Sequence, residues 1–243
     1  MIPQVRGIFA AAFTLLAAPT LAVTCQDITF SDVDFTICDV DPSVENLRLF
    51  HLDQNNAPLA SFREIERSHP DRALLFAMNA GMYHSDLSPV GHYIEDNTQT
   101  MRVIPNAGPG NFGMLPNGVF CIQDDIAQVF ETLAYVDQQP DCTHATQSGP
   151  MLVIDGALHP RFIEGSTSRH LRNGVGTSAD GSRVVFAISN QVVNFHTFAR
   201  LFRDHLNLPN ALYFDGKVSR LHARDLNRSD NGFAMGPIVG VLE

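Results

Sequence analysis

Short stretches of alternating or continuous apolar residues, separated by turn-forming residues, run through most of the chain. Polar and apolar residues alternate from Thr29 to Ile37 and from Leu47 to Leu52, which predicts half-buried strands. Continuous apolar runs predict buried strands, and these are Ala73–Met78, Val119–Ile122, Met151–Ile154, Val184–Ile188, Leu212–Phe214 and Ile238–Leu242. The pattern therefore predicts a protein in which strands predominate.

Helical signals are confined to two stretches. Phe62–Ser68 predicts a short helix, and Asn194 is placed to cap a longer helix from Phe195 to Leu206, which Pro209 would end. Because strands outnumber helices, we predict an α+β fold. It would have mixed, largely antiparallel sheets with a few flanking helices, in a single domain.

The first 22 residues have the pattern of a secretory signal peptide. Arg6 precedes an apolar run from Gly7 to Ala18, and small residues lie before a predicted cleavage after Ala22. The apolar run is too short to span a bilayer as a mature helix. We therefore expect a domain over residues 23–243 that is periplasmic or secreted, with no membrane insertion of the mature chain.

The charge balance argues against nucleic acid as a partner. Without residues 1–22 the chain carries 15 Lys and Arg against 26 Asp and Glu, so its net charge repels polyanions. A phosphate-bearing substrate would need the few cations concentrated at its site. The arginines near the turn-rich segments are the candidates, namely Arg161, Arg169, Arg172, Arg220 and Arg224.

Four cysteines are expected to form two disulfides in an oxidising compartment. Among the three pairings, Cys25–Cys38 together with Cys121–Cys142 closes the shortest loops, and we predict that arrangement. The cysteines and histidines have no spacing typical of a zinc site, so no metal ligands are predicted. The sequence requires no cofactor and leaves a role for a divalent cation open.

Polar, glycine-containing segments follow or open several predicted strands. Residues 105–118 and 165–173 are predicted loops, the second rich in Ser, Thr, Arg and His and a candidate functional loop. Four further segments combine Asn, Ser, Arg or Asp with glycines that allow close approach to the backbone. They read FAMNAGMY, SGPMLVIDGALHP, RNGVGTSADG and ALYFDGKVSRL.

Taken in order, these four segments resemble the phosphodiester glycosidase family, which includes the lysosomal uncovering enzyme, an N-acetylglucosamine-1-phosphodiester alpha-N-acetylglucosaminidase, and exported bacterial proteins. The resemblance covers about Leu74 to Gly240. Ala80 replaces the first glycine of the family pattern, Asn173-Gly174 replaces Thr-Ala, and Lys217-Val218 replaces two glycines. These departures are closer to a bacterial subgroup than to the lysosomal enzyme.

The resemblance implies hydrolysis of a sugar-1-phosphodiester at the anomeric C–O bond, acting on a small-molecule or glycan substrate that carries a sugar phosphate. It implies three catalytic residues. Asp215 would be the nucleophile or the base that activates water, Arg172 would hold the phosphate, and Asn79 would bind the sugar or order the loops. The implied substrate-binding residues are Ser148, Gly149, Gly81, Gly176, Lys217 and Ser219. Lys217 would assist with the phosphate, and Ser219 would orient Asp215.

Several alternatives stay open from the sequence. Asp-Gly between apolar segments is also a strong hairpin signal, so Asp215 could mark a turn. Reserve acids and proton carriers are Glu95, Glu164, Asp180, His84, His170 and His222, with Asp180 expected to cap a turn instead. At the level of function, the alternatives are a non-catalytic module that binds carbohydrate or envelope polymer, and a phosphodiesterase that cuts the P–O bond. The second of these usually needs clustered metal ligands.

Overall fold

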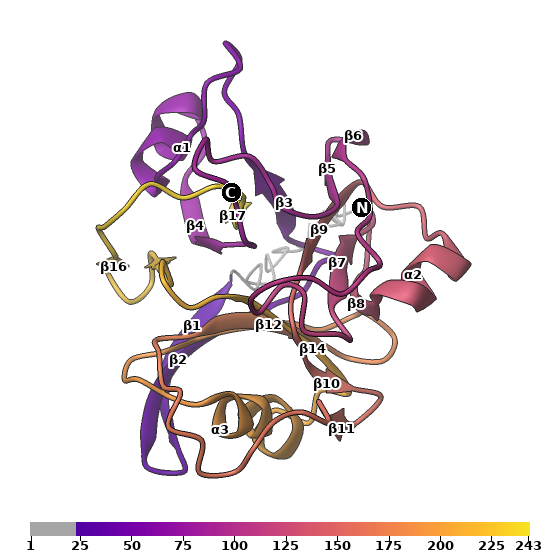
Figure 1. Ribbon diagram of the computed structural model, residues 1–243. Coiled ribbons are helices and arrows are strands. Elements are labelled where there is room, and N and C mark those ends of the chain that lie inside the picture. The colour runs from indigo at the N-terminus through magenta and orange to yellow at the C-terminus, as the bar shows by residue number, and fades with distance from the viewer. Residues whose placement is uncertain (1–22) are drawn as a thin grey trace, which may run out of the picture.

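A seven-stranded antiparallel sheet forms the base of the molecule (Figure 1). This computed structural model describes residues 23–243, so the predicted signal peptide lies outside the described residues. In order across this first sheet, the strands are β1 (Thr24–Phe30), β2 (Val33–Val40), β13 (Val184–Ser189), β12 (Asn173–Thr177), β14 (Asn210–Asp215), β10 (Met151–Ile154) and β11 (Ala157–Leu158).

Two five-stranded sheets pack above the first one, and every strand pairing within them is antiparallel. The second sheet has the order β16 (Arg228–Ser229), β15 (Leu221–Ala223), β4 (Leu74–Asn79), β17 (Ile238–Leu242) and β3 (Asn46–Phe50). The third sheet has the order β6 (Thr98–Met101), β5 (Tyr93–Glu95), β9 (His144–Ser148), β7 (Gly118–Ile122) and β8 (Ala127–Glu131). The predicted fold class, α+β with largely antiparallel sheets in one domain, is confirmed.

Phenylalanines from all three sheets meet in the centre of the core. Phe76 of the second sheet contacts Phe186 of the first, with ring centroids 4.7 Å apart. Phe120 of the third sheet contacts Phe186 at 5.8 Å and Phe214 at 6.4 Å. All four rings are fully buried, and each contributes about 1.5–3 kcal/mol through burial. This shared core fixes the position of the three sheets relative to one another.

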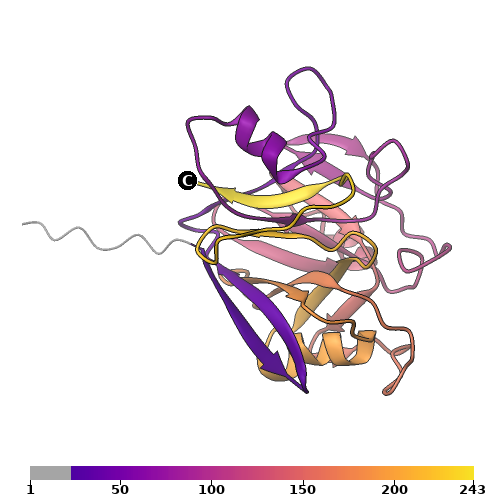
Figure 2. The same ribbon diagram turned by 90° about the vertical axis from the view of Figure 1, so that its left-hand side faces the viewer.

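The single strand predicted for Thr29–Ile37 is wrong, because this stretch contains a hairpin. Strand β1 ends at Phe30, and Ser31 and Asp32 both have positive φ before β2 begins at Val33. A two-residue turn with positive φ matches the twist of paired strands. Because the turn is so short, the alternation is interrupted only by the polar pair Ser31-Asp32, which the prediction of a single strand passed over. Figure 2 shows this hairpin reaching out from the body of the molecule.

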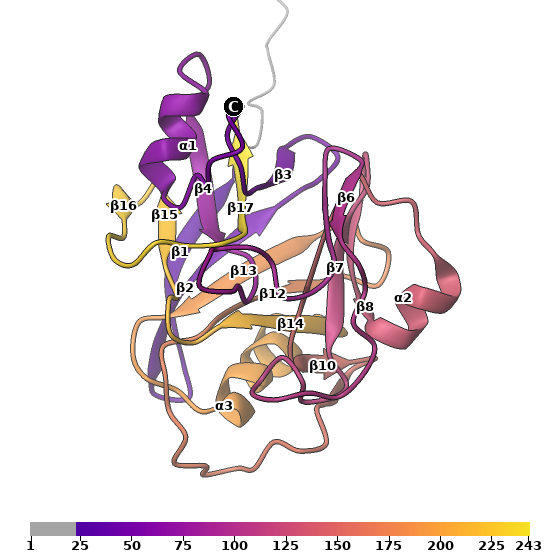
Figure 3. The same cartoon turned by 45° about the horizontal axis from the view of Figure 1, so that its top comes forward.

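The helices lie on the outside of the sheets. Helix α1 (Phe62–Ser68) has the predicted bounds, whereas α2 (Thr132–Gln138) was not predicted. The second predicted helix is present as α3 (Phe195–Arg200), which continues as the π-helical turn η1 (Leu201–His205). As predicted, Asn194 caps it, its side-chain oxygen accepting from the Thr197 N–H at 2.9 Å. Figures 1 and 3 show α3 beneath the first sheet, near β10 and β14.

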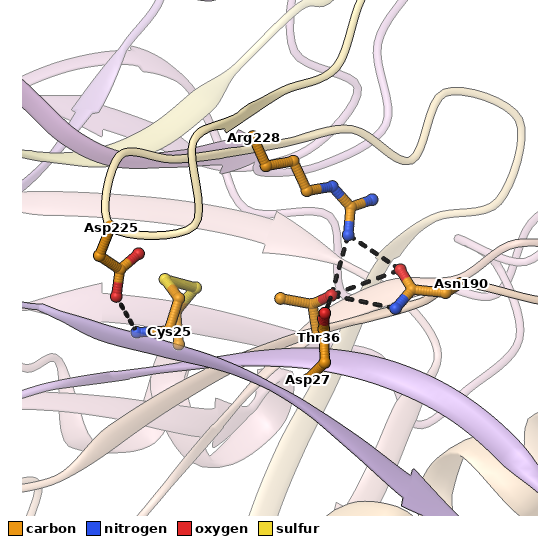
Figure 4. The surroundings of a disulfide bond; sticks show 7 residues. Cys25, Asp27, Thr36, Asn190, Asp225 and Arg228 are labelled. Atoms are coloured by element: carbon orange, nitrogen blue, oxygen red, sulfur yellow. Dashed lines mark hydrogen bonds between the residues drawn. A yellow bond between two sulfur atoms is a disulfide. The ribbon is translucent and has the colours of Figure 1, made fainter.

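Both predicted disulfides are present, Cys25–Cys38 and Cys121–Cys142. The first links β1 to β2, and the loop from β15 to β16 closes over it, as Figure 4 shows. Asp225 accepts a hydrogen bond from the Cys25 N–H at 2.7 Å, and Arg228 donates to the Thr36 hydroxyl and to the Asn190 side-chain oxygen, both at 2.9 Å. These bonds fasten the second sheet to the first. No helix within residues 23–243 is long and apolar enough to cross a bilayer.

Candidate active site

The four segments singled out in the sequence converge where the three sheets meet. Asn79 ends β4 of the second sheet, and Ser148 ends β9 of the third. In the first sheet, Asn173 opens β12 and Asp215 ends β14, and these two residues are partners in the strand register. Segments far apart in the sequence therefore place their polar residues at one junction.

Asp215 does not belong to a hairpin turn, so that alternative is wrong. Strand β14 pairs with β12 and β10 in the first sheet. The next strand, β15, pairs with β4 and β16 in the second sheet. The segment after Asp215 thus crosses from one sheet to another, and the aspartate lies at the crossing point.

The carboxylate of Asp215 is held by the turn that follows it. Its Oδ1 accepts from the N–H groups of Gly216 and Lys217, the second at 2.9 Å. Burial raises the pKa of Asp215, while the two N–H bonds and the Lys217 charge oppose the increase. The side chain is only partly exposed. Asp215 is therefore a partly desolvated acid, and the neighbouring Lys217 ammonium stabilises its ionised form.

Asn79 and Asn173 form a reciprocal pair beneath Asp215, and both are fully buried. The Asn79 amide donates to the Asn173 side-chain oxygen at 3.2 Å, and the Asn173 amide donates to the Asn79 backbone carbonyl at 2.8 Å. The same side-chain oxygens accept from backbone N–H groups, Asn79 from Arg220 at 2.9 Å and Asn173 from Asp215 at 3.1 Å. Of the two roles predicted for Asn79, these contacts favour ordering the loops over binding the sugar.

The two predicted serines also support the Asp215 turn. Ser219 donates to the Asp215 backbone carbonyl at 2.8 Å and lies 3.3 Å from the Asn173 side-chain oxygen. Ser148 is fully buried and donates to the Phe214 carbonyl at 3.0 Å. Both hydroxyls therefore fix the end of β14, which agrees with the orienting role expected of Ser219.

Arg172 lies in the core, with an exposed fraction of 1%. Its guanidinium carbon is 3.6 Å from the ring centre of Phe195, its Nε donates to the Val193 carbonyl at 2.9 Å, and its Nη2 donates to the Ser168 carbonyl at 3.2 Å. Burial lowers its pKa. These contacts describe a packed cation that anchors the loop before β12, and its Nη1 is buried without a hydrogen-bond partner among residues 23–243. The phosphate-holding role of Arg172 stays a prediction.

Tyr213, which was not singled out in the sequence, lies two residues before Asp215 on β14, and the pairing of β14 with β12 shifts register between them. Burial is the main cause of its strongly raised pKa. A Cβ on Gly216 would lie 2.2 Å from the Tyr213 hydroxyl oxygen, so a side chain at this position would require the tyrosine ring to move. The Asp215 charge also contributes to the raised Tyr213 pKa, which indicates that the phenol lies near the carboxylate.

Asp215 and Lys217 open onto a pocket of about 490 Å³. Tyr83 and His84 also line it, so His84 is the reserve histidine that the structure places there. Burial and the Asp215 charge raise the pKa of Tyr83, while Arg220 opposes this. The remaining lining residues are Met82, Val90, Pro109, Phe112 and Val218. Pro109 and Phe112 come from the predicted loop 105–118, whose composition gave no reason to expect a role at the site.

The three predicted site glycines have different surroundings. Gly81 lies beside Thr146 and Ser148, and Gly149 packs against Asn117, where a Cβ would be 2.7 Å from the Asn117 Cβ. The structure does not bring Gly176 to the pocket. A Cβ there would lie 2.6 Å from Phe202 and 2.8 Å from Leu208, so the absence of a side chain at Gly176 lets η1 and the residues after it pack on β12.

Most other candidates lie elsewhere. His222 forms hydrogen bonds with Ser229 and with the Leu74 carbonyl. Arg220 donates to the carbonyls of Asp230 and Phe233. Asp180 caps a turn, as predicted, by accepting from Ser178 and Ser182. Arg224 and Glu243 form an ion pair and line a second, larger cavity of about 750 Å³, to which none of the four segments contributes. His170 lies beside Gly216. Glu95, Glu164, Arg161 and Arg169 do not line the Asp215 pocket.

A family model of phosphodiester glycosidases matches residues 72–237, which include every residue described at the junction. The chain belongs to the phosphodiester glycosidase family. Uncharacterized protein YigE of Escherichia coli strain K12 is 32% identical over 216 residues, covering 88% of this chain and 84% of that protein.

Solved structures of this fold include the catalytic domain of zebrafish N-acetylglucosamine-1-phosphodiester alpha-N-acetylglucosaminidase, auto-inhibited by its pro-peptide. The match has a TM-score of 0.61 at 16% identity and covers 91% of this chain and 82% of that one. A hypothetical protein from Synechocystis matches with a TM-score of 0.59 at 13% identity, over 90% of this chain and 61% of that one. At these identities the two matches show a shared fold.

Proposed function

We propose that this protein hydrolyses a sugar-1-phosphodiester at the bond between the anomeric carbon and the phosphate oxygen. The observation that carries the proposal is the pairing of the partly buried Asp215 carboxylate with Lys217 in one pocket, at the junction of the family's four segments. A carboxylate and a cation side by side suit a reaction in which positive charge develops on a sugar carbon and negative charge on a phosphate.

The reaction needs little acid assistance, because a phosphomonoester is a good leaving group. In the proposed reaction Asp215 supplies the carboxylate near the anomeric carbon, as nucleophile or as the base that activates water, and Lys217 contacts the phosphate. Water adds its oxygen to the anomeric carbon, the C–O bond breaks with its electron pair going to the phosphate oxygen, and a free sugar and a phosphomonoester leave. Lys217 takes the phosphate-binding role that the sequence assigned first to Arg172.

The setting of this activity is also part of the proposal. Two disulfides are typical of proteins that fold in an oxidising compartment. With the predicted signal peptide, they support a periplasmic or secreted enzyme that acts on an exported or envelope component carrying a sugar phosphate. The sugar is not specified by the residues at the junction.

Two alternatives make different use of the same pocket. A binding module would hold the ligand without needing the Asp215 charge for chemistry. A two-metal phosphodiesterase would need clustered ligands, and residues 23–243 contain no group of three or more His, Cys, Asp or Glu placed to hold a metal ion. Of the three hypotheses, only the glycosidase gives the Asp215 carboxylate a role in breaking the bond at the anomeric carbon.

The test is product analysis with the mature chain and a panel of sugar-1-phosphodiesters, one of them derived from N-acetylglucosamine. We expect free sugar and phosphomonoester from the wild type, none from Asp215→Asn, and full turnover from Asp180→Asn, a matched change at an exposed turn. Sugar 1-phosphate and free alcohol as products would contradict the proposal. Binding of the panel without turnover would favour the binding module.

A further inference from the structure

The pocket beside Asp215 is mostly apolar, which is unusual for a site that must hold a sugar phosphate. Among its nine lining residues there is no Asn, Gln, Ser, Thr or Arg. The Tyr83 hydroxyl donates to the Ala234 carbonyl at 2.8 Å, so its hydrogen is already used. The wall is made by the side chains of Met82, Val90, Pro109, Phe112 and Val218.

These apolar side chains come from three separate segments and are held in place. Phe112 is buried and packs against Gly91, where a Cβ would lie 2.7 Å from the ring, and its carbonyl accepts from the Asn117 amide at 3.0 Å. Met82 and Val218 are partly buried and pack on two different core clusters. The wall is therefore built into the fold.

A polar loop borders the same turn without contributing to the pocket. Residues 163–171 are mostly exposed and include Ser, Thr, Arg and His side chains. A Cβ on Gly216 would lie 3.6 Å from the His170 Cβ, and Ser219 lies 3.4 Å from the Leu171 carbonyl. The Asp215 turn thus has a polar loop and an apolar pocket as separate neighbours.

The polar loop and the apolar pocket on either side of the Asp215 turn suit the two groups that a phosphodiester joins, a sugar and an alcohol. A sugar presents hydroxyl groups that need polar partners, whereas an alkyl chain is stabilised by leaving water for an apolar wall. Lys217 lies in the pocket itself, so the phosphate would lie at the boundary between the two groups. A volume of about 490 Å³ is within the range of small-molecule pockets, about 300–1,000 Å³.

We propose that the natural substrate is an amphiphile, a sugar-1-phosphodiester of an alkyl alcohol, and that the apolar pocket binds the alkyl chain. This inference rests on the proposed function and names its substrate class. The inference distinguishes this protein from an enzyme whose substrate is two sugars joined through a phosphate. In such a substrate, the hydroxyl groups of the second sugar would face five apolar side chains.

The test uses methyl, butyl and octyl esters of one sugar 1-phosphate, below the concentration at which the octyl ester forms micelles, with a mannose ester as the hydrophilic comparison. Binding is measured calorimetrically on Asp215→Asn, and turnover on the wild type. The octyl ester should bind about 100-fold tighter than the methyl ester, the gain expected if about half of its additional methylenes are buried. The mannose ester should bind no better than the methyl ester.

Val218→Thr tests whether this wall makes the difference. It keeps the shape of the side chain but replaces one methyl group with a hydroxyl, and should lower the octyl-to-methyl ratio of affinities by about threefold or more. Val44→Thr, at an exposed valine away from the pocket, should leave the ratio unchanged. Equal binding of all alkyl esters, or tightest binding of the mannose ester, overturns the inference. Graded binding with no turnover of any ester supports the apolar pocket and overturns the proposed function instead.

Discussion

The Asn79–Asn173 pair and the Asp215–Lys217 turn are hydrogen-bonded neighbours, but they use their polar atoms in opposite ways. The two asparagines are fully buried, and their side-chain amides and oxygens form hydrogen bonds with each other and with backbone groups. Asp215 and Lys217 face a pocket. The comparison shows that the polar residues of the four segments have two different roles. Some hold the site together, and others can contact a substrate.

The largest expected effect separates activity from stability at Asp215. Asp215→Asn should lower kcat by about 1,000-fold or more, because the carboxylate acts in the bond-breaking step. The Tm should stay the same or rise, since burial disfavours the ionised form and Asn keeps an acceptor for the turn N–H groups. Steady-state kinetics and calorimetry check both. A large fall in Tm would show that Asp215 has a structural role like that of the two asparagines.

The opposite pattern is expected at Asn173. Asn173→Ala leaves the buried N–H of Asp215 and the amide of Asn79 without their acceptor, which should cost about 1–3 kcal/mol of unfolding free energy. Activity should fall as well, because the end of β14 loses its support. Urea denaturation measures the stability change. A variant with wild-type stability and reduced kcat would show that Asn173 contacts the substrate instead.

Lys217 should change the pH profile of the reaction. The Asp215 pKa is raised by burial and lowered by the Lys217 charge, so removing the ammonium raises it further. Because the carboxylate form is required, activity is lost as pH falls through that pKa. Lys217→Met should therefore move the acid limb of kcat/KM to higher pH and increase KM. An acid limb that stays in place would mean that Lys217 does not act on Asp215.

The smallest effect concerns two partly buried acids that do not line the pocket. Burial raises the pKa of Glu45 and of Glu95 to about 7 from 4.5. Each is protonated more readily in the folded state, so its stability contribution is full below pH 4.5 and is lost as pH rises through 7. Burial lowers the pKa of His51, His92, His144 and His159, which acts in the opposite direction, so the Glu95 effect is measured as a difference from the wild type. The Tm of Glu95→Gln relative to the wild type should be higher at pH 8 than at pH 5.

Glu95→Gln also serves as a control for the comparison of the two regions. Glu95 accepts from the Tyr93 hydroxyl at 2.8 Å and lies outside the Asp215 pocket. Its turnover at neutral pH should equal that of the wild type. Loss of turnover in this variant would show that a raised carboxyl pKa outside the pocket matters for the reaction.

The hydrophobic pattern predicted the strands that carry Asn79 and Asp215 but not those that carry Ser148 and Asn173. Strands β4, β10, β13 and β14 have apolar runs and were found. Strands β9 and β12, with the sequences HATQS and NGVGT, are fully buried but polar or glycine-rich, so no pattern distinguishes them from loops. Their place in the centre of a sheet depends on neighbours far away in the sequence.

The same limit explains where the structure places the predicted site residues. Asp215, Lys217 and Ser219 follow an apolar strand, and the family resemblance drew attention to them. Burial cannot be read from residue type, so a ligand-binding role was predicted for Arg172, which in the structure packs on Phe195. The apolar wall of the pocket comes from loops around Met82 and Phe112, whose proximity depends on the junction of three sheets.

The position of bond cleavage tests the central claim most directly. The mature protein would hydrolyse a sugar-1-phosphodiester in water labelled with a heavy oxygen isotope, and mass spectrometry would locate the label. The account predicts label in the released sugar and none in the phosphomonoester, with no release above background in Asp215→Asn. Label in the phosphate, or equal release by the variant, would contradict a glycosidase reaction centred on Asp215.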